Sequence, residues 1–125
     1  MKIALLGYGR MGKEIEKIAL SRGHEIVIRK DVDDTIDITL ADVAIDFSVP
    51  SAAVGNLSKA LNNNVPVISG TTGWLKDYDD ITRLCKERDG AFIYASNFSL
   101  GVNIFFELNK SLAKTMETFS SVYWL

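Results

Sequence analysis

"IALLGYGRMGKEI", residues 3–15, decides the fold of this chain. An apolar run leads into glycines with the spacing G-x-G-x-x-G, and a helical pattern begins directly after them. Gly7 permits a tight turn, Gly9 lets the backbone approach a pyrophosphate, and Gly12 lets the helix pack closely on the strand. The N-terminus of that helix offers unpaired N–H groups and a positive dipole end to phosphates. Because the motif follows a strand and opens a helix, it predicts dinucleotide binding, with a purely structural glycine turn as the alternative.

Short apolar runs recur along the chain and are predicted to be strands. They cover residues 2–6, 25–29, 43–47, 65–69 and 91–95. Nearly continuous apolar strands are typical of a parallel sheet that is covered on both faces. Helical patterns separate them, at residues 11–22, 50–62, 76–88 and 101–117. The alternation predicts an α/β fold, a Rossmann-type doubly wound and mostly parallel sheet in one domain over residues 1–125.

Local signals mark where these elements begin and end. Gly23 is placed to end the first helix. Ser48 is a candidate N-cap for the second helix, and Pro50 lies in its first turn. The last residues, "SSVYWL" at 120–125, have the pattern of half a strand. We therefore expect the sheet to be incomplete at its C-terminal end.

Apolar side chains form stripes along the predicted helices. The first helix places Ile15, Ile18 and Ala19 on one face. The stripes of the third and fourth helices are Tyr78, Ile81, Leu84 and Cys85, and Val102, Phe105, Leu108, Leu112 and Met116. Cys85 is thus expected to be an inert core thiol, and the acidic residues 77–80 suit the positive end of the third helix.

The composition excludes several classes of protein. The 125 residues carry a formal net charge of −2, so there is no basic field for nucleic acid or an anionic membrane. No run of 18 or more apolar residues is present, which gives no membrane span. One cysteine cannot form an internal disulfide, and the chain starts directly with a strand rather than a signal peptide. We expect a cytoplasmic protein.

The end of the second predicted strand bears on the choice of cofactor. The strand ends in Arg29 and Lys30, and Asp31 follows. Cations at this place suit the 2′-phosphate of NADPH, whereas an acidic residue suits the ribose hydroxyls of NADH. The two cations favour NADPH, and Asp31 keeps NADH open. The alternative is a solvated charged turn without a ligand.

Three further stretches extend the pattern beyond a generic fold. They are "AIDFSVP" at 44–50, "ISGTTGW" at 68–74 and "ASNFSLGVN" at 95–103. Together with "GYGRMG", in this order and spacing, they resemble dihydrodipicolinate reductase, the NAD(P)H-dependent enzyme of bacterial lysine and diaminopimelate synthesis. The resemblance covers essentially the whole chain, although its glycine loop is one residue shorter than in many members of that family.

The resemblance implies a set of cofactor-binding residues at the carboxyl ends of the strands. The glycine loop would face the phosphates, "DFS" would lie alongside the cofactor, and "GTTG" and "ASNF" would lie near the nicotinamide. The residues so implied are Gly7, Tyr8, Gly9, Arg10, Met11, Gly12, Phe47, Ser48, Gly70, Thr71, Thr72, Ala95, Ser96, Asn97 and Phe98. Arg29 and Lys30 join them from the strand-end argument above.

The resemblance also implies what this stretch of sequence lacks. The family's second domain carries a paired-histidine segment, a lysine and a Ser-Gly-Thr run that hold and protonate a cyclic unsaturated dicarboxylate, and it supplies most contacts of a homotetramer. None of these motifs occurs in the chain, and His24 precedes the second strand, away from the site. We therefore assign no catalytic residue and no metal ligand, since "DVDD" at 31–34 lacks the glycine and the terminal glutamate of a calcium loop. The chain alone is expected to bind cofactor without turnover.

Two other functions fit the glycine loop. One is another dehydrogenase of amino-acid metabolism, such as an aspartate or homoserine dehydrogenase, against which "DFSVP" and "GTTGW" argue. The other is a Rossmann module without enzymatic activity that binds NAD(H) or CoA.

Overall fold

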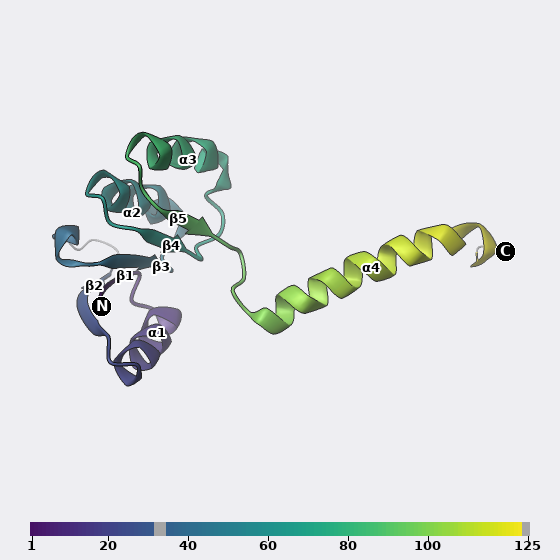
Figure 1. Cartoon of the computed structure of the whole chain (residues 1–125), viewed down its shortest axis with the longest axis horizontal. Coiled ribbons are helices and arrows are strands. Elements are labelled where there is room, and N and C mark those ends of the chain that lie inside the picture. Colours follow the sequence, from purple (N-terminus) through teal and green to yellow (C-terminus); the bar gives the residue numbers. More distant parts are fainter. Residues whose placement is uncertain (32–34, 124–125) are drawn as a thin grey trace.

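A computed structural model describes residues 1–31 and 35–123, with side chains as far as residue 119. Its centre is one parallel sheet with the strand order β2-β1-β3-β4-β5 (Figure 1). The strands are β1 (Lys2–Leu6), β2 (Glu25–Lys30), β3 (Val43–Asp46), β4 (Val67–Ser69) and β5 (Phe92–Tyr94). All five lie within a residue or two of the predicted runs, so the predicted Rossmann-type α/β fold is confirmed.

Helices cover both faces of the sheet. Helix α1 (Arg10–Ser21) lies on one face, and α2 (Pro50–Asn62) and α3 (Tyr78–Glu87) lie on the other (Figure 1). Short 3-10 turns, η1 (Ile38–Leu40) and η2 (Leu75–Asp77), precede β3 and α3. The acidic first turn of α3 is present as expected, with Asp79 and Asp80 near the positive end of the helix.

The two faces of the sheet have separate apolar cores, because side chains alternate along each strand. Ile3 and Leu5 of β1 pack with Ala19 of α1. On the opposite face, Ala4 and Leu6 join a larger cluster that includes Leu57 of α2. Every one of these side chains is at most 5% exposed. Burial of each large one stabilises the fold by about 1.5–3 kcal/mol.

The predicted helix ends are right in two cases and wrong in one. Gly23 follows the C-cap of α1 with φ of +77°, and Pro50 is the first residue of α2. The N-cap of α2 is Val49 rather than Ser48, so that prediction is wrong. The Ser48 hydroxyl instead donates to the buried carboxylate of Asp46 at 2.7 Å. A hydrogen bond to an ionised carboxylate is stronger than the neutral hydrogen bond that a serine hydroxyl accepts from an N–H group at a helix start.

The predicted stripes are buried only in part. Ala19 is buried in α1, but Ile18 is 49% exposed, because the side of α1 that faces the sheet is set by Gly12 and Ala19. In α3, Ile81 is buried and Leu84 and Cys85 pack at the edge of the core. The Cys85 thiol is free and partly buried.

Helix α4 (Leu100–Tyr123) extends away from the sheet (Figure 1). Its apolar stripe is exposed, with Leu108 at 64% and Leu112 at 59%. The strand predicted at residues 120–125 is wrong for residues 120–123, which continue α4; residues 124–125 lie outside the described residues. A helix that already exists gains one hydrogen bond for each residue added, whereas a strand needs a neighbour to pair with. None of the helices described is both long enough and apolar enough to cross a membrane.

Candidate functional site

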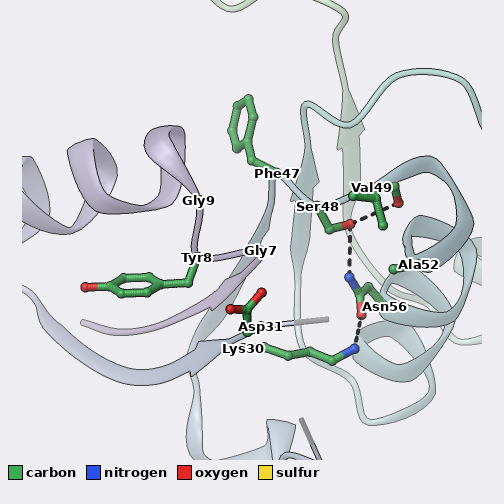
Figure 2. Close-up of a pocket in the computed structure, with 10 residues that line it drawn as sticks. All are labelled: Gly7, Tyr8, Gly9, Lys30, Asp31, Phe47, Ser48, Val49, Ala52 and Asn56. Carbon is green, nitrogen blue, oxygen red and sulfur yellow. Dashed lines mark hydrogen bonds between the residues drawn. The ribbon is translucent and has the colours of Figure 1, made fainter. Parts of the chain in front are cut away.

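The loops that follow β1, β2 and β3 surround a cavity of about 240 Å³ at the carboxyl ends of the strands (Figure 2). This is the edge at which an open α/β sheet binds its ligands. The residues that line the cavity are Gly7, Tyr8, Gly9, Lys30, Asp31, Phe47, Ser48, Val49, Ala52 and Asn56. Six of them belong to the set predicted from sequence, namely Gly7, Tyr8, Gly9, Lys30, Phe47 and Ser48.

Each glycine of the loop has a different environment. Gly7 has φ of +101°, and a Cβ atom there would lie 2.2 Å from the carbonyl oxygen of Phe47. A Cβ on Gly12 would lie 2.4 Å from the carbonyl oxygen of Gly7, so both residues are needed for the fold itself. A Cβ on Gly9 would meet nothing within 4 Å. Gly9 therefore leaves space beside the cavity that the fold does not use.

The start of helix α1 next to the cavity suits an anion. Its N-cap is Gly9, no side chain caps the helix, and its first turn contains no acidic residue. The first amides of a helix have no partner within the helix. The side chains of Arg10 and Met11 in this turn are exposed and do not line the cavity. The backbone rather than a side chain is thus the feature that faces the open space.

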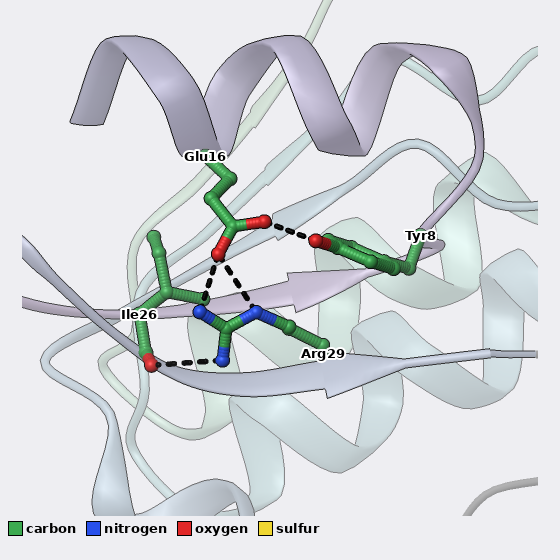
Figure 3. Close-up of polar contacts among 4 residues, drawn as sticks. All are labelled: Tyr8, Glu16, Ile26 and Arg29. Atoms are coloured by element: carbon green, nitrogen blue, oxygen red, sulfur yellow. Dashed lines mark hydrogen bonds and ion pairs between the residues drawn. The ribbon is translucent and has the colours of Figure 1, made fainter. Parts of the chain in front are cut away.

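The two cations at the end of β2 point to opposite faces of the sheet. The ammonium of Lys30 donates to Oδ1 of Asn56 on α2 at 2.6 Å (Figure 2). The guanidinium of Arg29 instead pairs with Glu16 on α1, with Nε 2.8 Å from Oε1 (Figure 3). Of the two predicted cations, the structure brings Lys30 into the cavity, and it brings Asp31 there as well.

Arg29, Glu16 and Tyr8 form a hydrogen-bonded cluster on the α1 face (Figure 3). The hydrogen bonds from Arg29 and then from the Tyr8 hydroxyl hold the pKa of Glu16 below its ordinary value. The same contact with Glu16 raises the pKa of the Tyr8 phenol. The cluster fixes the side of the glycine loop that faces away from Lys30.

A buried carboxylate outside the predicted set of site residues connects the strand ends. Asp46 ends β3 and is fully buried. Its Oδ1 accepts from Ser48 Oγ at 2.7 Å and from Asn56 Nδ2 at 2.9 Å. Its Oδ2 accepts from Ser69 Oγ at 3.0 Å and from Thr71 Oγ1 at 2.8 Å. Four donors are the kind of compensation that a buried charge requires.

The network joins the loops after β3 and β4 directly. The Thr71 hydroxyl also accepts from the backbone N–H of Ser48 at 2.8 Å, and the Thr71 carbonyl accepts from Trp74 Nε1 at 2.7 Å. Two features of the sequence point to this network. Asp46 is a charged residue at the end of an otherwise apolar strand, and Asn56 lies among the apolar positions that α2 buries.

The ring of Phe47, which follows β3, contacts residues of the loops after β4 and β5 beside the cavity. The ring of Phe47 lies so close to Gly70 that a Cβ there would be 2.1 Å from the ring. Phe98 packs edge-on against the same ring, with 6.4 Å between centroids. Asn97 accepts from the Ser99 N–H at 2.7 Å through Oδ1, which orders the loop before α4. Thr72, Ala95 and Ser96 lie in these two loops and do not line the cavity.

Among the described residues, no group of three or more His, Cys, Asp or Glu side chains is placed to hold a metal ion. Residues 32–34 of the acidic "DVDD" segment lie outside the described residues. His24 precedes β2 at the amino ends of the strands, opposite to the cavity.

The chain is similar in sequence to reductases of known family. A family model named dihydrodipicolinate reductase, N-terminus, matches residues 17–98. The chain is 57% identical over 121 residues to a 4-hydroxy-tetrahydrodipicolinate reductase of Christiangramia forsetii, which covers 94% of this chain and 50% of that protein. It is 34% identical over 97 residues to the reductase of the same name from Methanoregula boonei, covering 78% of this chain and 38% of that protein. The chain thus spans half or less of the length of these curated relatives.

Two solved structures with a similar fold are homoserine dehydrogenases. A homoserine dehydrogenase of S. aureus superposes with a TM-score of 0.55 at 21% identity, covering 75% of this chain and 32% of that one. A hyperthermophilic archaeal homoserine dehydrogenase in complex with NADPH gives a TM-score of 0.57 at 14% identity, covering 74% of this chain and 43% of that one. Identities this low show a shared fold alone.

Proposed function

Because this chain belongs to the dihydrodipicolinate reductase family, we propose that it is the part of such a reductase that binds NADPH or NADH. The cofactor would lie across the carboxyl ends of the strands, from the cavity beside β2 to the loops after β4 and β5. The observation that carries this proposal is the open space at Gly9, next to an uncapped helix start.

The residues present fit a dinucleotide. The first amides of α1 would hold the pyrophosphate. Lys30 and Asp31 would face the ribose of the adenosine half, because they line the cavity at the end of β2. Gly70, Thr71 and Thr72, and the segment 95–98, would position the nicotinamide half. The bound cofactor supplies the hydride, while these residues bind and orient it.

The activity of the whole protein is part of this proposal. The reductase would transfer the hydride to a cyclic unsaturated dicarboxylate of the lysine and diaminopimelate route, in the cytoplasm and as a homotetramer. The residues that anchor and protonate such a substrate would come from a second domain. Within this chain we assign no catalytic residue, and the 125 residues alone are expected to bind the cofactor and not to reduce the substrate.

Titration calorimetry on the chain tests the proposal through a pair of matched variants. Both Gly9 and Gly55 have open space where a Cβ would stand, so Gly9→Ala and Gly55→Ala should both fold. Gly9→Ala places a methyl group where the pyrophosphate would approach, and it should weaken NADPH binding by roughly tenfold or more, which is about 1.4 kcal/mol. Gly55→Ala lies on helix α2 and should bind like the wild type. Absence of NADPH and NADH binding by the folded wild-type chain, or equal binding by both variants, would refute the proposal.

A further inference from the structure

The cavity beside β2 contains a cation whose position is fixed by other residues. Among the described residues that line it, Lys30 is the one Lys or Arg, since Arg29 is paired with Glu16 on the opposite face. Asp31 also lines this cavity and brings a negative charge to its wall (Figure 2). A phosphate here would meet both signs of charge. The place of the Lys30 ammonium therefore decides whether a phosphate or a hydroxyl is favoured.

The side-chain amide of Asn56 can take only one orientation. Asn56 is 4% exposed, and its Nδ2 donates to Asp46 Oδ1 at 2.9 Å and to Ser48 Oγ at 3.2 Å. A carboxylate only accepts hydrogen bonds, so a flipped amide would set two oxygens against each other. The Oδ1 atom of Asn56 must then face the cavity, where it accepts from Lys30 at 2.6 Å.

The hydrogen bond from Lys30 to Asn56 orders a lysine side chain, which is otherwise among the most flexible side chains. A lysine loses much rotamer freedom when a ligand immobilises it. With Asn56 holding one of its three N–H donors, the ammonium of Lys30 is already placed in the cavity and has two donors left for a ligand. Preorganisation of this kind raises affinity because less ordering remains to be done on binding.

We propose that Asn56, oriented by the buried Asp46, is the positioning residue that makes the cavity select a 2′-phosphate over a 2′-hydroxyl, by holding the Lys30 ammonium in place. This inference rests on the proposed function and deepens it, because it names the residue that sets the preference for NADPH. Asn56 touches Lys30 and not the reacting atoms.

Two small probes isolate the effect, because adenosine 2′,5′-bisphosphate and adenosine 5′-monophosphate differ only in the 2′-phosphate. The wild-type chain should bind the bisphosphate at least roughly tenfold more tightly, or about 1.4 kcal/mol. Asn56→Ser keeps a hydroxyl near Asp46 but is too short to hold Lys30, and it should remove most of this preference while monophosphate affinity changes less than about twofold. Asn63→Ser is the matched control, because the same change at the exposed end of α2 should leave the preference intact.

A double-mutant cycle checks that Asn56 acts through Lys30. Lys30→Met should lower the preference to the level of Asn56→Ser, and the double variant should show no further loss. Equal loss of both probes in Asn56→Ser, an unchanged preference, or additive losses would each overturn the inference. Wild-type binding of both probes with equal affinity would overturn it too and leave the proposed function standing, whereas binding of neither probe nor cofactor would refute both.

A measurement on the wild type serves if Asn56→Ser does not fold. NMR of the lysine ammonium groups, with Lys30 assigned through Lys30→Met, should find the Lys30 protons protected from exchange in the unliganded chain. The bisphosphate should shift this signal, and the monophosphate should not. An ammonium that exchanges like the exposed lysines of the chain would contradict the inference.

Discussion

Thr71→Val should destabilise the chain far more than the loss of one hydroxyl suggests. The Thr71 hydroxyl is buried, donates to Asp46 Oδ2 at 2.8 Å and accepts from the Ser48 N–H at 2.8 Å. Valine has the same shape but leaves a buried carboxylate short of one donor and a partly buried N–H without this acceptor. Each group left unsatisfied costs about 1–3 kcal/mol, so the sum is about 2–6 kcal/mol. That is a large part of the 5–15 kcal/mol that stabilises a typical domain.

Thr71→Ser is the matched control, because it keeps the hydroxyl and removes one methyl group, for a loss of about 0.8 kcal/mol. Urea unfolding followed by far-UV circular dichroism gives both free energies of unfolding. In a Trp124→Phe background, fluorescence of Trp74, whose Nε1 donates to the Thr71 carbonyl, reports the same region locally. If the valine and serine variants differ by less than about 0.5 kcal/mol, the hydrogen bonds of Thr71 do not hold the strand ends together, and the argument from Asp46 is refuted.

Three further predictions concern other parts of the chain. The lowered pKa of Glu16 stabilises the folded chain at pH values above its ordinary pKa of 4.5, and this stabilisation is lost as the pH falls below that value. In urea unfolding between about pH 5 and pH 3, the stability of the wild type should therefore decline more steeply than that of Glu16→Gln, and parallel curves would contradict this. Leu57→Ala, in the core, should cost about 2–5 kcal/mol, whereas Leu112→Ala on exposed α4 should stay within about 0.5 kcal/mol; similar losses in thermal unfolding would show that α4 packs on the sheet. Gly7→Ala should lower the melting temperature much more than Gly9→Ala, because only the first places a methyl group against backbone atoms, whereas the second only replaces the glycine N-cap of α1 with a poorer one; equal melting temperatures would remove the distinction.

The architecture could be predicted because each signal for it is repeated along the chain. Five apolar runs, each followed by a helical pattern, leave few arrangements other than a parallel sheet with helices on both faces. The glycine loop could be recognised because the fold leaves no space for a side chain at two of its glycines. Gly7 and Gly12 have backbone atoms within 2.5 Å of where a Cβ would stand, so no other residue type fits.

Single residues were harder to place because their roles depend on neighbours distant in sequence. Arg29 and Lys30 are both predicted from sequence to lie at the ribose edge, yet adjacent residues of a strand point to opposite faces. Lys30 lies in the cavity and Arg29 faces Glu16. Strand alternation was therefore a usable signal, whereas the pairing with Glu16, 13 residues away, was not visible in the sequence.

The strand prediction for residues 120–123 is wrong for a different reason. A short apolar run such as that at 120–125 has no periodicity that separates strand from helix. The outcome depends on what precedes it, and α4 continues through residue 123 without interruption. The long helix that precedes this run decides its conformation, and the six residues 120–125 taken alone carry no sign of that helix.

The buried carboxylate of Asp46 links the stability of the fold to the properties of the site. Its Oδ2 holds Ser69 and Thr71 at the end of β4, the side proposed for the nicotinamide. Its Oδ1 fixes Asn56, and through it Lys30, on the side proposed for the adenosine ribose. One group thus sets the geometry of both ends of the proposed cofactor site. A buried carboxylate is costly unless its hydrogen-bond donors are present, and here the four donors come from the loops after β3 and β4, the end of β4 and helix α2. The same four groups therefore stabilise the fold and hold the residues of the proposed cofactor site in place.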